Sequence, residues 1–520
     1  MPTTWARRGG ECGAARVAPT GQTARHVRTP GARLAGSWGA ACAAAALALL
    51  APARRARAVP LDDPNVGGIG FSGPTTGDPA AVYWNPAALG LMHGPQLMVS
   101  STLSAGTVTV QREPIDGMPA FPSARASETT HPFSWPPGPG AFLGIGSDVG
   151  GDRFALAVAA FVPYAERTTF QGSNDPSLPT RYHRISADLR NLALVPALAV
   201  RFVGNFRLGF APGFLFSTGR VSFDETTCGL AGRPACTEDP TADARYDIAS
   251  SSGFTSAKFA ITLGGGLFYQ RRGWEMGLAF SSRPFGGSGL NPAGVAGNDT
   301  QVTLPARDGG TPLTCLNGRA DGRGCVFADL TYKLPYTLTA GVGWHPRPGA
   351  ELGLIVRYVS FPSDDLIDIR IARAPGATDG LPDHIVLHRG YRSALDTRLR
   401  FAQWLGERIR VGAGVRLETS ALPAAEVSPA AVDGLKVQPT VMVLVRPVKH
   451  LSVSAGYGFT YMFNVNGGTA FDPSAASTCE AAGGDLDACR LRLAGLARPT
   501  AAGTYGSHRH DVSLSLTTQF

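Results

Sequence analysis

The sequence predicts an all-β protein: a 14-stranded antiparallel transmembrane β-barrel with an N-terminal plug in its lumen. Three observations lead to this fold: an apolar leader of the secretory type, segments in which apolar residues alternate with small or polar ones, and connections that are short and long in turn. The composition agrees. Gly accounts for 65 and Pro for 40 of the 520 residues and only 17% are charged, which suits one large β-structure better than several soluble cores.

The leader, residues 1–58, explains the basic composition. It holds nine arginines and one acidic residue, Glu11, and so carries the whole net charge of +8. The rest of the chain is neutral, with 38 basic and 38 acidic residues. A basic surface for nucleic acid is therefore not expected.

An apolar run from Ala40 to Ala51 follows these arginines, and Ala56-Arg57-Ala58 offers small residues for cleavage. Twelve apolar residues are too few for a transmembrane helix, which needs about 20. The pattern is typical of a cleaved signal peptide rather than an anchor, with cleavage expected after Ala58. The expected organisation is thus a signal peptide over 1–58, a plug over 59–94 and a barrel over 95–520.

Eight cysteines are present, and Cys12 and Cys42 belong to the leader. The other six form three local pairs in Gly-, Asp- and Pro-rich stretches: Cys228 with Cys236, Cys315 with Cys325, and Cys479 with Cys489. An even number of cysteines in an exported chain favours disulfides. A zinc site would need Cys-x-x-Cys spacing or convergent histidines, which these pairs lack.

From about residue 95, segments of 9–15 residues alternate large apolar with small or polar residues, as membrane β-strands do. Leu451, Val453 and Ala455, for example, alternate with Ser452 and Ser454. Fourteen strands are expected, near residues 95–111, 139–149, 152–163, 182–203, 206–218, 253–269, 273–283, 327–345, 350–360, 383–404, 408–419, 435–447, 450–464 and 507–520.

The connections decide between a membrane barrel and a soluble β-sandwich, because both folds produce alternation. Short connections such as Gly204-Asn205 and Val448-Lys449 separate long ones, near 112–138, 164–181, 219–252, 284–326, 361–382, 420–434 and 465–506. Short periplasmic turns that alternate with long extracellular loops are the plan of an outer-membrane barrel, and a sandwich has no reason to keep this rhythm. The expected location is therefore the cell outer membrane, with all three cysteine pairs in long loops.

The C-terminus supports the same location. The chain ends in an alternating segment from Asp511 to Phe520, and its last residue is aromatic. This resembles the sorting signal that the barrel-assembly machinery reads in outer-membrane proteins. Phe520 is the expected recognition residue, although Thr518 stands where an aromatic residue is common.

The segment before the first strand carries a second set of signals. It contains a glycine-rich stretch followed by an Asn-Pro-Ala motif: Gly67, Gly68, Gly70, Gly73, then Asn85, Pro86 and Ala87. This combination resembles the FadL family of outer-membrane transporters for long-chain fatty acids and aromatic hydrocarbons, in which such a motif lies within a plug inside the barrel. Three further stretches are similar to the family: Phe161-Val162-Pro163-Tyr164, Leu334-Pro335-Tyr336-Thr337-Leu338 and Gly503-Thr504-Tyr505.

The resemblance implies passive uptake of a hydrophobic compound by a monomeric barrel without a cofactor. It also implies capture at the extracellular loops, movement of the plug, and lateral exit into the bilayer. Other expected partners are outer-membrane lipid and lipopolysaccharide.

The residues themselves also favour a plug. A barrel of about 14 strands has a lumen too wide for wall side chains alone to fill. Pro86 fixes φ and lacks an N–H, so the segment cannot simply add a strand, and the glycines permit backbone paths closed to other residues. Asn85 is expected to hydrogen-bond the wall or its own turn.

Two other functions remain open: a phospholipase-like outer-membrane hydrolase, and a structural or adhesive barrel with disulfide-stapled loops. A hydrolase needs Ser and His on neighbouring strands, and no such pair with a third member is evident. Gly264-Gly265-Gly266 lies within a strand and is no phosphate loop, so no enzyme and no cofactor are expected. His508 and His510 share a strand face but lack further ligands, so no metal is expected. Four arginines fall on lumen-facing positions: Arg398, Arg400, Arg410 and Arg416.

Overall fold

The computed structural model describes residues 65–112, 124–129, 140–151, 153–170, 178–226, 243–251, 259–285, 294–296, 299–303, 326–362, 366–373, 384–467 and 501–520. The chain divides into two units, 1–54 and 55–520, and all described residues belong to the second. The expected signal peptide 1–58 and all eight cysteines lie outside the described residues.

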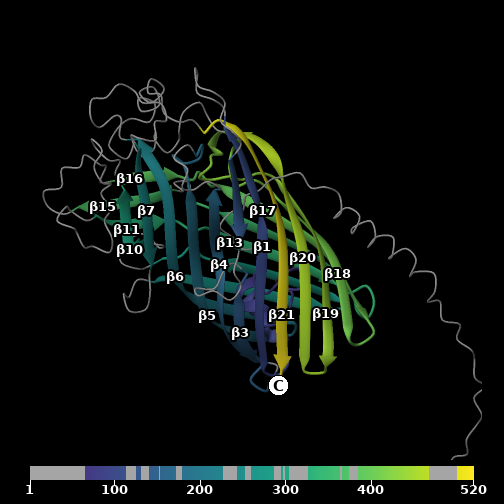
Figure 1. Ribbon diagram of the computed structural model, residues 1–520. Helices are drawn as coiled ribbons and strands as arrows, with labels where there is room; N and C mark the ends of the chain where they lie inside the picture. The colour runs from purple at the N-terminus through teal and green to yellow at the C-terminus, as the bar shows by residue number, and fades with distance from the viewer. Residues whose placement is uncertain are drawn as a thin grey trace, which may run out of the picture. The chain divides into compact units, whose positions relative to one another are not determined.

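Within the described part of the chain, fourteen strands form a closed antiparallel ring, which confirms the predicted barrel (Figure 1). The last strand pairs with the first over its whole length, from Gln96 opposite Gln519 to Arg112 opposite Gly503, and so closes the ring. The ring consists of β1 (Gln96–Arg112), β3 (Phe142–Ser147), β4 (Phe154–Phe170), β5 (Ser186–Val203), β6 (Phe206–Thr226), β8 (Ala260–Arg271), β9 (Trp274–Ser281), β13 (Tyr336–Trp344), β14 (Ala350–Ser360), β17 (Ser393–Leu405), β18 (Ile409–Glu418), β19 (Lys436–Val448), β20 (Leu451–Gly467) and β21 (Gly503–Gln519).

Seven further strands extend the wall beyond the ring. Three join the main sheet, and the other four form a small sheet in the order β10-β12-β15-β16. They are β2 (Ala124–Thr129), β7 (Asp243–Ser251), β11 (Asp299–Thr303), β10 (Gly294–Ala296), β12 (Val326–Tyr332), β15 (Leu366–Arg373) and β16 (His384–His388).

Two of the predicted strands are interrupted in the structure. The segment 327–345 divides into β12 and β13 around Leu334-Pro335, because proline has no N–H to continue a ladder. The segment 383–404 divides into β16 and β17, and Gly390 between them has a left-handed φ of 69°.

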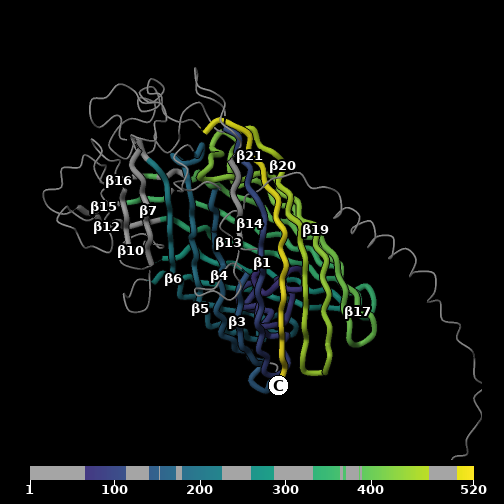
Figure 2. Tube along the Cα trace, in the orientation of Figure 1, coloured from purple at the N-terminus to yellow at the C-terminus, as the bar shows by residue number. Residues whose placement is uncertain are grey.

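The short connections all lie at the end of the ring that holds the C-terminus, as antiparallel neighbours require (Figure 2). Arg272-Gly273, for example, joins β8 to β9 with φ values of 47° and 81°. Left-handed φ at both residues suits a two-residue turn between twisted antiparallel strands. This end faces the periplasm in bacterial barrels, and the long loops face the outside.

The two faces of the wall have opposite chemistry. On β21 the side chains of Asp511, Ser513 and Ser515 are 0–5% exposed and point into the ring. Their neighbours Val512 and Leu514 point outward and are 50% and 59% exposed. An apolar outer face and a polar inner face are what a bilayer and an aqueous lumen require.

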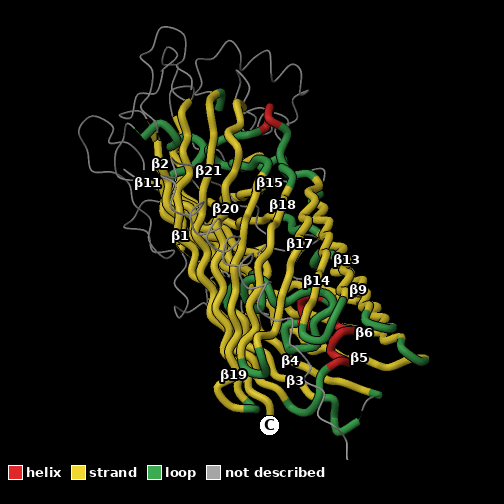
Figure 3. The backbone as a smooth tube through the Cα atoms, turned by 90° about the vertical axis from the view of Figure 1, so that its right-hand side faces the viewer, coloured by secondary structure: helices red, strands yellow, loops and turns green. Residues whose placement is uncertain are grey.

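Helical structure is sparse among the described residues. α2 (Ala81–Trp84) and the 3₁₀ turn η1 (Pro86–Leu91) precede the first strand, and η5 (Ala424–Glu426) lies between β18 and β19. Figure 3 shows α2 and η1 in red in the lower half of the ring. None of the described helices is long and apolar enough to cross a membrane.

Candidate functional site: the N-terminal segment and its contacts

The N-terminal segment, residues 65–94, packs against the inner face of the wall. α2 contacts β4 and β5, and η1 contacts β4, β5, β6, β8 and β9. Val66, Trp84 and Leu89 are almost completely buried. None of the described residues of the segment before Gln96 forms a wall strand.

Asn85 joins this segment to the wall. Its side chain is fully buried, and Nδ2 donates to the carbonyl oxygen of Pro74 at 2.9 Å and to that of Leu267 on β8 at 3.0 Å. Its Oδ1 accepts from the N–H of Ala87 at 3.1 Å and so caps η1, which begins at Pro86. One side chain therefore fixes the start of η1, an internal turn and a wall strand at the same time.

Wall glycines make room for this motif. A Cβ at Gly266 would lie 2.0 Å from Asn85 Oδ1, one at Gly209 would lie 2.1 Å from the nitrogen of Ala87, and one at Gly277 would lie 2.3 Å from the carbonyl oxygen of Pro74. All three distances are far below van der Waals contact. Gly266 was expected only as part of a strand, and the signal for its role is its position on the inward face of β8.

The glycine-rich stretch turns sharply beside β21. Gly67, Gly68 and Gly70 have left-handed φ values of 83°, 99° and 95°, which favour glycine. The N–H of Ile69 between them donates to Ser513 Oγ at 2.9 Å. Gly73 is not left-handed, but a Cβ there would lie 2.8 Å from Ile355 Cδ1, so it serves close packing against β14.

Arg400 on β17 holds the same stretch from the opposite side. Its Nη1 donates to the carbonyl oxygen of Phe71 at 2.7 Å and lies 3.3 Å from those of Gly70 and Ser72. Its Nη2 donates to Glu351 Oε1 at 2.7 Å. The second carboxylate oxygen of Glu351 pairs with Arg410, whose guanidinium carbon lies 5.0 Å from the centre of the Phe71 ring. These contacts form the Arg400 latch: Arg400, Glu351 and Arg410 against residues 70–72.

Two more arginines clasp the aromatic part of the segment. The guanidinium carbon of Arg398 lies 4.9 Å from the Trp84 ring centre, and that of Arg357 lies 5.6 Å from it. Arg357 also lies 4.8 Å from the Tyr83 ring centre. The indole N–H of Trp84 donates to the carbonyl oxygen of Val66 at 3.0 Å, so its polar atom is satisfied inside the segment.

The described part of the chain also contains a cavity of about 50 Å³ between this segment and the wall. Tyr83, Trp84 and Pro86 form one side, and Arg357 is its one charged lining residue. The wall side is mostly apolar and includes Phe161, Pro163, Tyr164, Ala193, Val195, Ala211, Leu215, Ala279 and Phe280.

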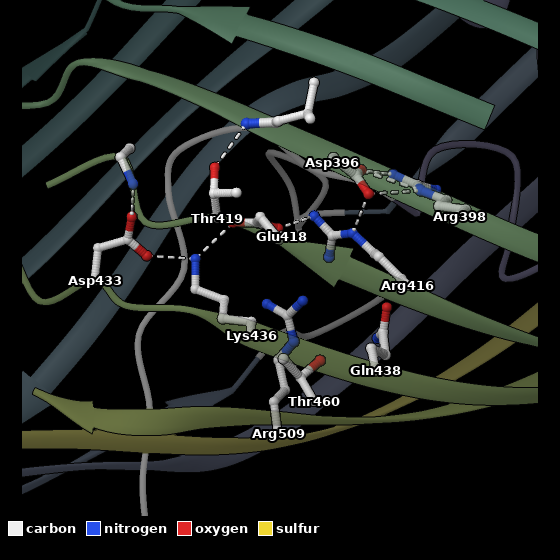
Figure 4. A network of polar contacts seen from close by, with 12 residues as sticks. Asp396, Arg398, Arg416, Glu418, Thr419, Asp433, Lys436, Gln438, Thr460 and Arg509 are labelled. Carbon is white, nitrogen blue, oxygen red and sulfur yellow. Dashed lines mark hydrogen bonds and ion pairs between the residues drawn. The ribbon is translucent and has the colours of Figure 1, made fainter.

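Charged side chains of β17 and β18, with Lys436 of β19 and Asp433 just before it, form a continuous network (Figure 4). Arg416 Nε lies 3.0 Å from Asp396 Oδ1, and Lys436 Nζ lies 2.6 Å from Glu418 Oε1. Arg398 and Asp433 complete the two ends. The four lumen-facing arginines predicted from strand parity thus all form ion pairs, with Arg400 and Arg416 buried and Arg398 and Arg410 half-buried, which makes this side of the lumen polar.

The remaining predicted residues lie apart from this site. His508 and His510 lie on the outer half of β21, and His510 Nδ1 is 2.8 Å from the Tyr457 hydroxyl. No metal-binding group of three or more His, Cys, Asp or Glu side chains occurs in the described ranges. Phe520 follows β21 at the periplasmic end, 75% exposed, and its N–H donates to the carbonyl oxygen of Pro95 at 3.0 Å.

The chain is similar to one family profile and to several solved barrel structures. The profile of the family described as "Outer membrane protein transport protein (OMPP1/FadL/TodX)" matches residues 47–264. A FadL homologue from Pseudomonas aeruginosa is 15% identical with a TM-score of 0.65, over 89% of this chain and 100% of that one. No curated protein matches significantly.

Two transporters of toluene have the same fold. The toluene transporter TodX of Pseudomonas putida is 14% identical with a TM-score of 0.57, over 88% of this chain and 99% of that one. The toluene transporter TbuX of Ralstonia pickettii is 14% identical with a TM-score of 0.55, over 89% and 98% of the two chains. The profile match over residues 47–264 agrees with the resemblance to the FadL family, and the solved structures share the barrel fold.

Proposed function

We propose that this barrel is a channel for the passive uptake of hydrophobic compounds, long-chain fatty acids or aromatic hydrocarbons, and that the N-terminal segment is a plug that gates it. The observation that carries the proposal is the cavity between Trp84 and the apolar side of the wall. It offers a hydrophobic solute a place in an otherwise polar lumen. The solved relatives named for toluene transport support the same class of solute.

The size of the cavity supports a gate. A cavity of about 150 Å³ is large enough to bind benzene. The cavity here is about 50 Å³, so even a small aromatic solute must displace a lining side chain. Four lining residues belong to the N-terminal segment, namely Val82, Tyr83, Trp84 and Pro86, and all the others belong to wall strands. Movement of the plug is therefore the simplest way to admit a solute.

The plug is held unequally on its two sides. Polar contacts tie residues 67–72 to β17 and β21, and Asn85 is tied to β8. Tyr83 and Trp84, by contrast, meet the wall through ring contacts, with apolar residues of the cavity and with arginine side chains. A hydrophobic solute competes directly with the apolar contacts and leaves the polar ones intact. We therefore expect the part around Trp84 to yield first, with the Arg400 latch as the hinge.

The cavity also adjoins an irregular part of the wall, where a lateral exit would lie. The pairing of β4 with β5 shifts register between Phe161 and Tyr164, which flank Pro163. β1 pairs with β3 as far as Ser100 and with β2 from Ala105 onward. The described strands therefore leave a break in this ladder between Ser100 and Ala105 of β1. A solute that leaves the cavity here would enter the bilayer directly.

The proposal is tested by the initial rate of uptake of radiolabelled toluene and oleate into cells that express the barrel. Cells with the wild-type chain should take up at least one of them faster than cells with empty vector. Asn85→Ala should change that rate because it removes three hydrogen bonds of the plug, whereas Asn205→Ala in an exposed turn is the matched control. Uptake equal to empty vector, with no solute bound by purified protein, would refute the transport proposal.

The two other functions make different predictions. A hydrolase would release fatty acid from phospholipid in detergent, and an adhesive barrel would bind a partner through its loops without solute flux. Neither has a specific observation in its favour in the described part of the molecule.

A further inference from the structure

The periplasmic rim of the barrel is strongly cationic. Among the described residues, seven arginine and lysine side chains are exposed at or within three residues of the short turns, and Arg201 is half-buried there. Among the acidic side chains in the same positions, Glu407 is exposed, and Asp148 and Glu275 are half-buried. The seven cations are Arg153, Arg271, Arg272, Arg347, Arg408, Arg446 and Lys449.

These cations surround the ring. Five of the six short turns contribute at least one of the seven: those between β3 and β4, β8 and β9, β13 and β14, β17 and β18, and β19 and β20. The turn between β5 and β6 contributes the half-buried Arg201. Within the described ranges, no carboxylate lies within ion-pairing distance of Arg271, Arg272, Arg408 or Arg446. A protein partner would need a patch on one side of the rim. A charge spread over the whole circumference fits a partner that surrounds the barrel.

A belt of outward aromatic residues lies immediately beside the cations. Phe202 and Trp274 are 69% and 44% exposed, and the Trp274 and Trp344 rings are stacked with their centres 5.6 Å apart. The guanidinium carbon of Arg446 lies 4.2 Å from the centre of the Trp404 ring. Aromatic side chains of this kind mark the level of the lipid headgroups, so the cations lie at the depth of the phosphates.

We propose that this rim binds anionic phospholipid headgroups of the inner leaflet of the outer membrane. Arginine suits this role because its planar guanidinium donates two parallel hydrogen bonds to a phosphate. The cations would fix the vertical position of the barrel and recruit anionic lipid to its periplasmic edge. The inference depends only on the barrel and not on which solute it carries.

The test uses the full chain purified in detergent and phosphatidylglycerol mixed equally with phosphatidylcholine, with bound lipid counted by native mass spectrometry. Wild-type barrel should retain phosphatidylglycerol in preference to phosphatidylcholine. Arg271→Gln with Arg272→Gln should lower that preference at least about fivefold, from the usual strength of one cation near an anionic surface. The matched control removes two exposed cations toward the long-loop end, Arg220→Gln with Arg392→Gln, and should keep the preference.

Three results would overturn the proposal. The first is equal retention of the two lipids by wild-type protein. The second is a control variant that loses as much preference as the rim variant. The third is loss of bound phosphatidylglycerol in inorganic phosphate but not in sodium chloride of equal ionic strength, because the rim would then bind a free anion rather than a lipid surface.

Discussion

Removal of the Arg400 latch should loosen the plug without unfolding the barrel. Arg400 donates one hydrogen bond of 2.7 Å to the plug and has two longer contacts of 3.3 Å, so Arg400→Ala removes essentially one strong, charge-assisted bond. Such a bond contributes about 1.5–3 kcal/mol. Glu351 is not left alone, because Arg410 still pairs with its other oxygen. We therefore expect a loss of about 2 kcal/mol in docking, which is about a 30-fold rise in the undocked fraction.

Hydrogen–deuterium exchange measures this directly. The N–H of Ile69 is bonded to Ser513 only while the plug is docked, so protection of residues 65–75 should fall about 30-fold in Arg400→Ala. Protection in β20 and β21 should not change. Arg347→Ala, which removes an exposed arginine from a short turn, is the control and should leave the plug protected. Unchanged protection of the plug, or an equal loss of protection throughout the wall, would show that the latch does not hold it.

Three further predictions concern the fit, the charge and the loops. Gly266→Val should displace the plug, because the valine side chain would occupy the position of Asn85 Oδ1. Ion conductance in planar bilayers should therefore rise. Gly265→Val is the control and should conduct like wild type, because a Cβ at Gly265 has no close neighbour. Burial raises the pKa of Asp78 from 3.8 to about 6, against the opposing effects of the Ala80 N–H and Arg400. The docked plug therefore favours the protonated carboxyl, and docking should weaken as pH rises from about 4 to about 6 and stay weaker above. Conductance should be lower at pH 4 than at pH 7, and Asp78→Asn should remove the difference. Non-reducing mass mapping should find Cys228–Cys236, Cys315–Cys325 and Cys479–Cys489, and pairs between different loops would contradict the local assignment.

The membrane wall could be predicted from sequence because lipid imposes a simple rule on it. Each strand that crosses the apolar layer must alternate, so β14 was expected over 350–360 and is found at Ala350–Ser360. The strands beyond the membrane obey no such rule. β10 has three residues and β2 reads ARASET, without an apolar face, so neither had a signal to detect.

The sequence could predict only those contacts of the site that join residues close together along the chain. Asn85 could be predicted because Asn-Pro disfavours a continuing strand, and because the N–H that its side chain accepts, that of Ala87, is only two residues away in the sequence. The partners of the plug did not stand out, because Arg400 lies 329 residues from Phe71 along the chain. Parity placed Arg400 in the lumen, but only closure of the ring brings β14, β17 and β18 around residues 70–72.

The most direct test of the gated channel is a plug that can be locked. A Cβ at Gly68 would lie 3.8 Å from the Cβ of Ser515, which suits a disulfide, so Gly68→Cys with Ser515→Cys should tether the plug to β21. Initial uptake of the transported solute would be measured in oxidised and reduced cells, with each single variant as a control for the native cysteines and for strain at Gly68. The account predicts slow uptake when the tether is oxidised and recovery on reduction. Uptake as fast through the tethered plug as through the free one would contradict it.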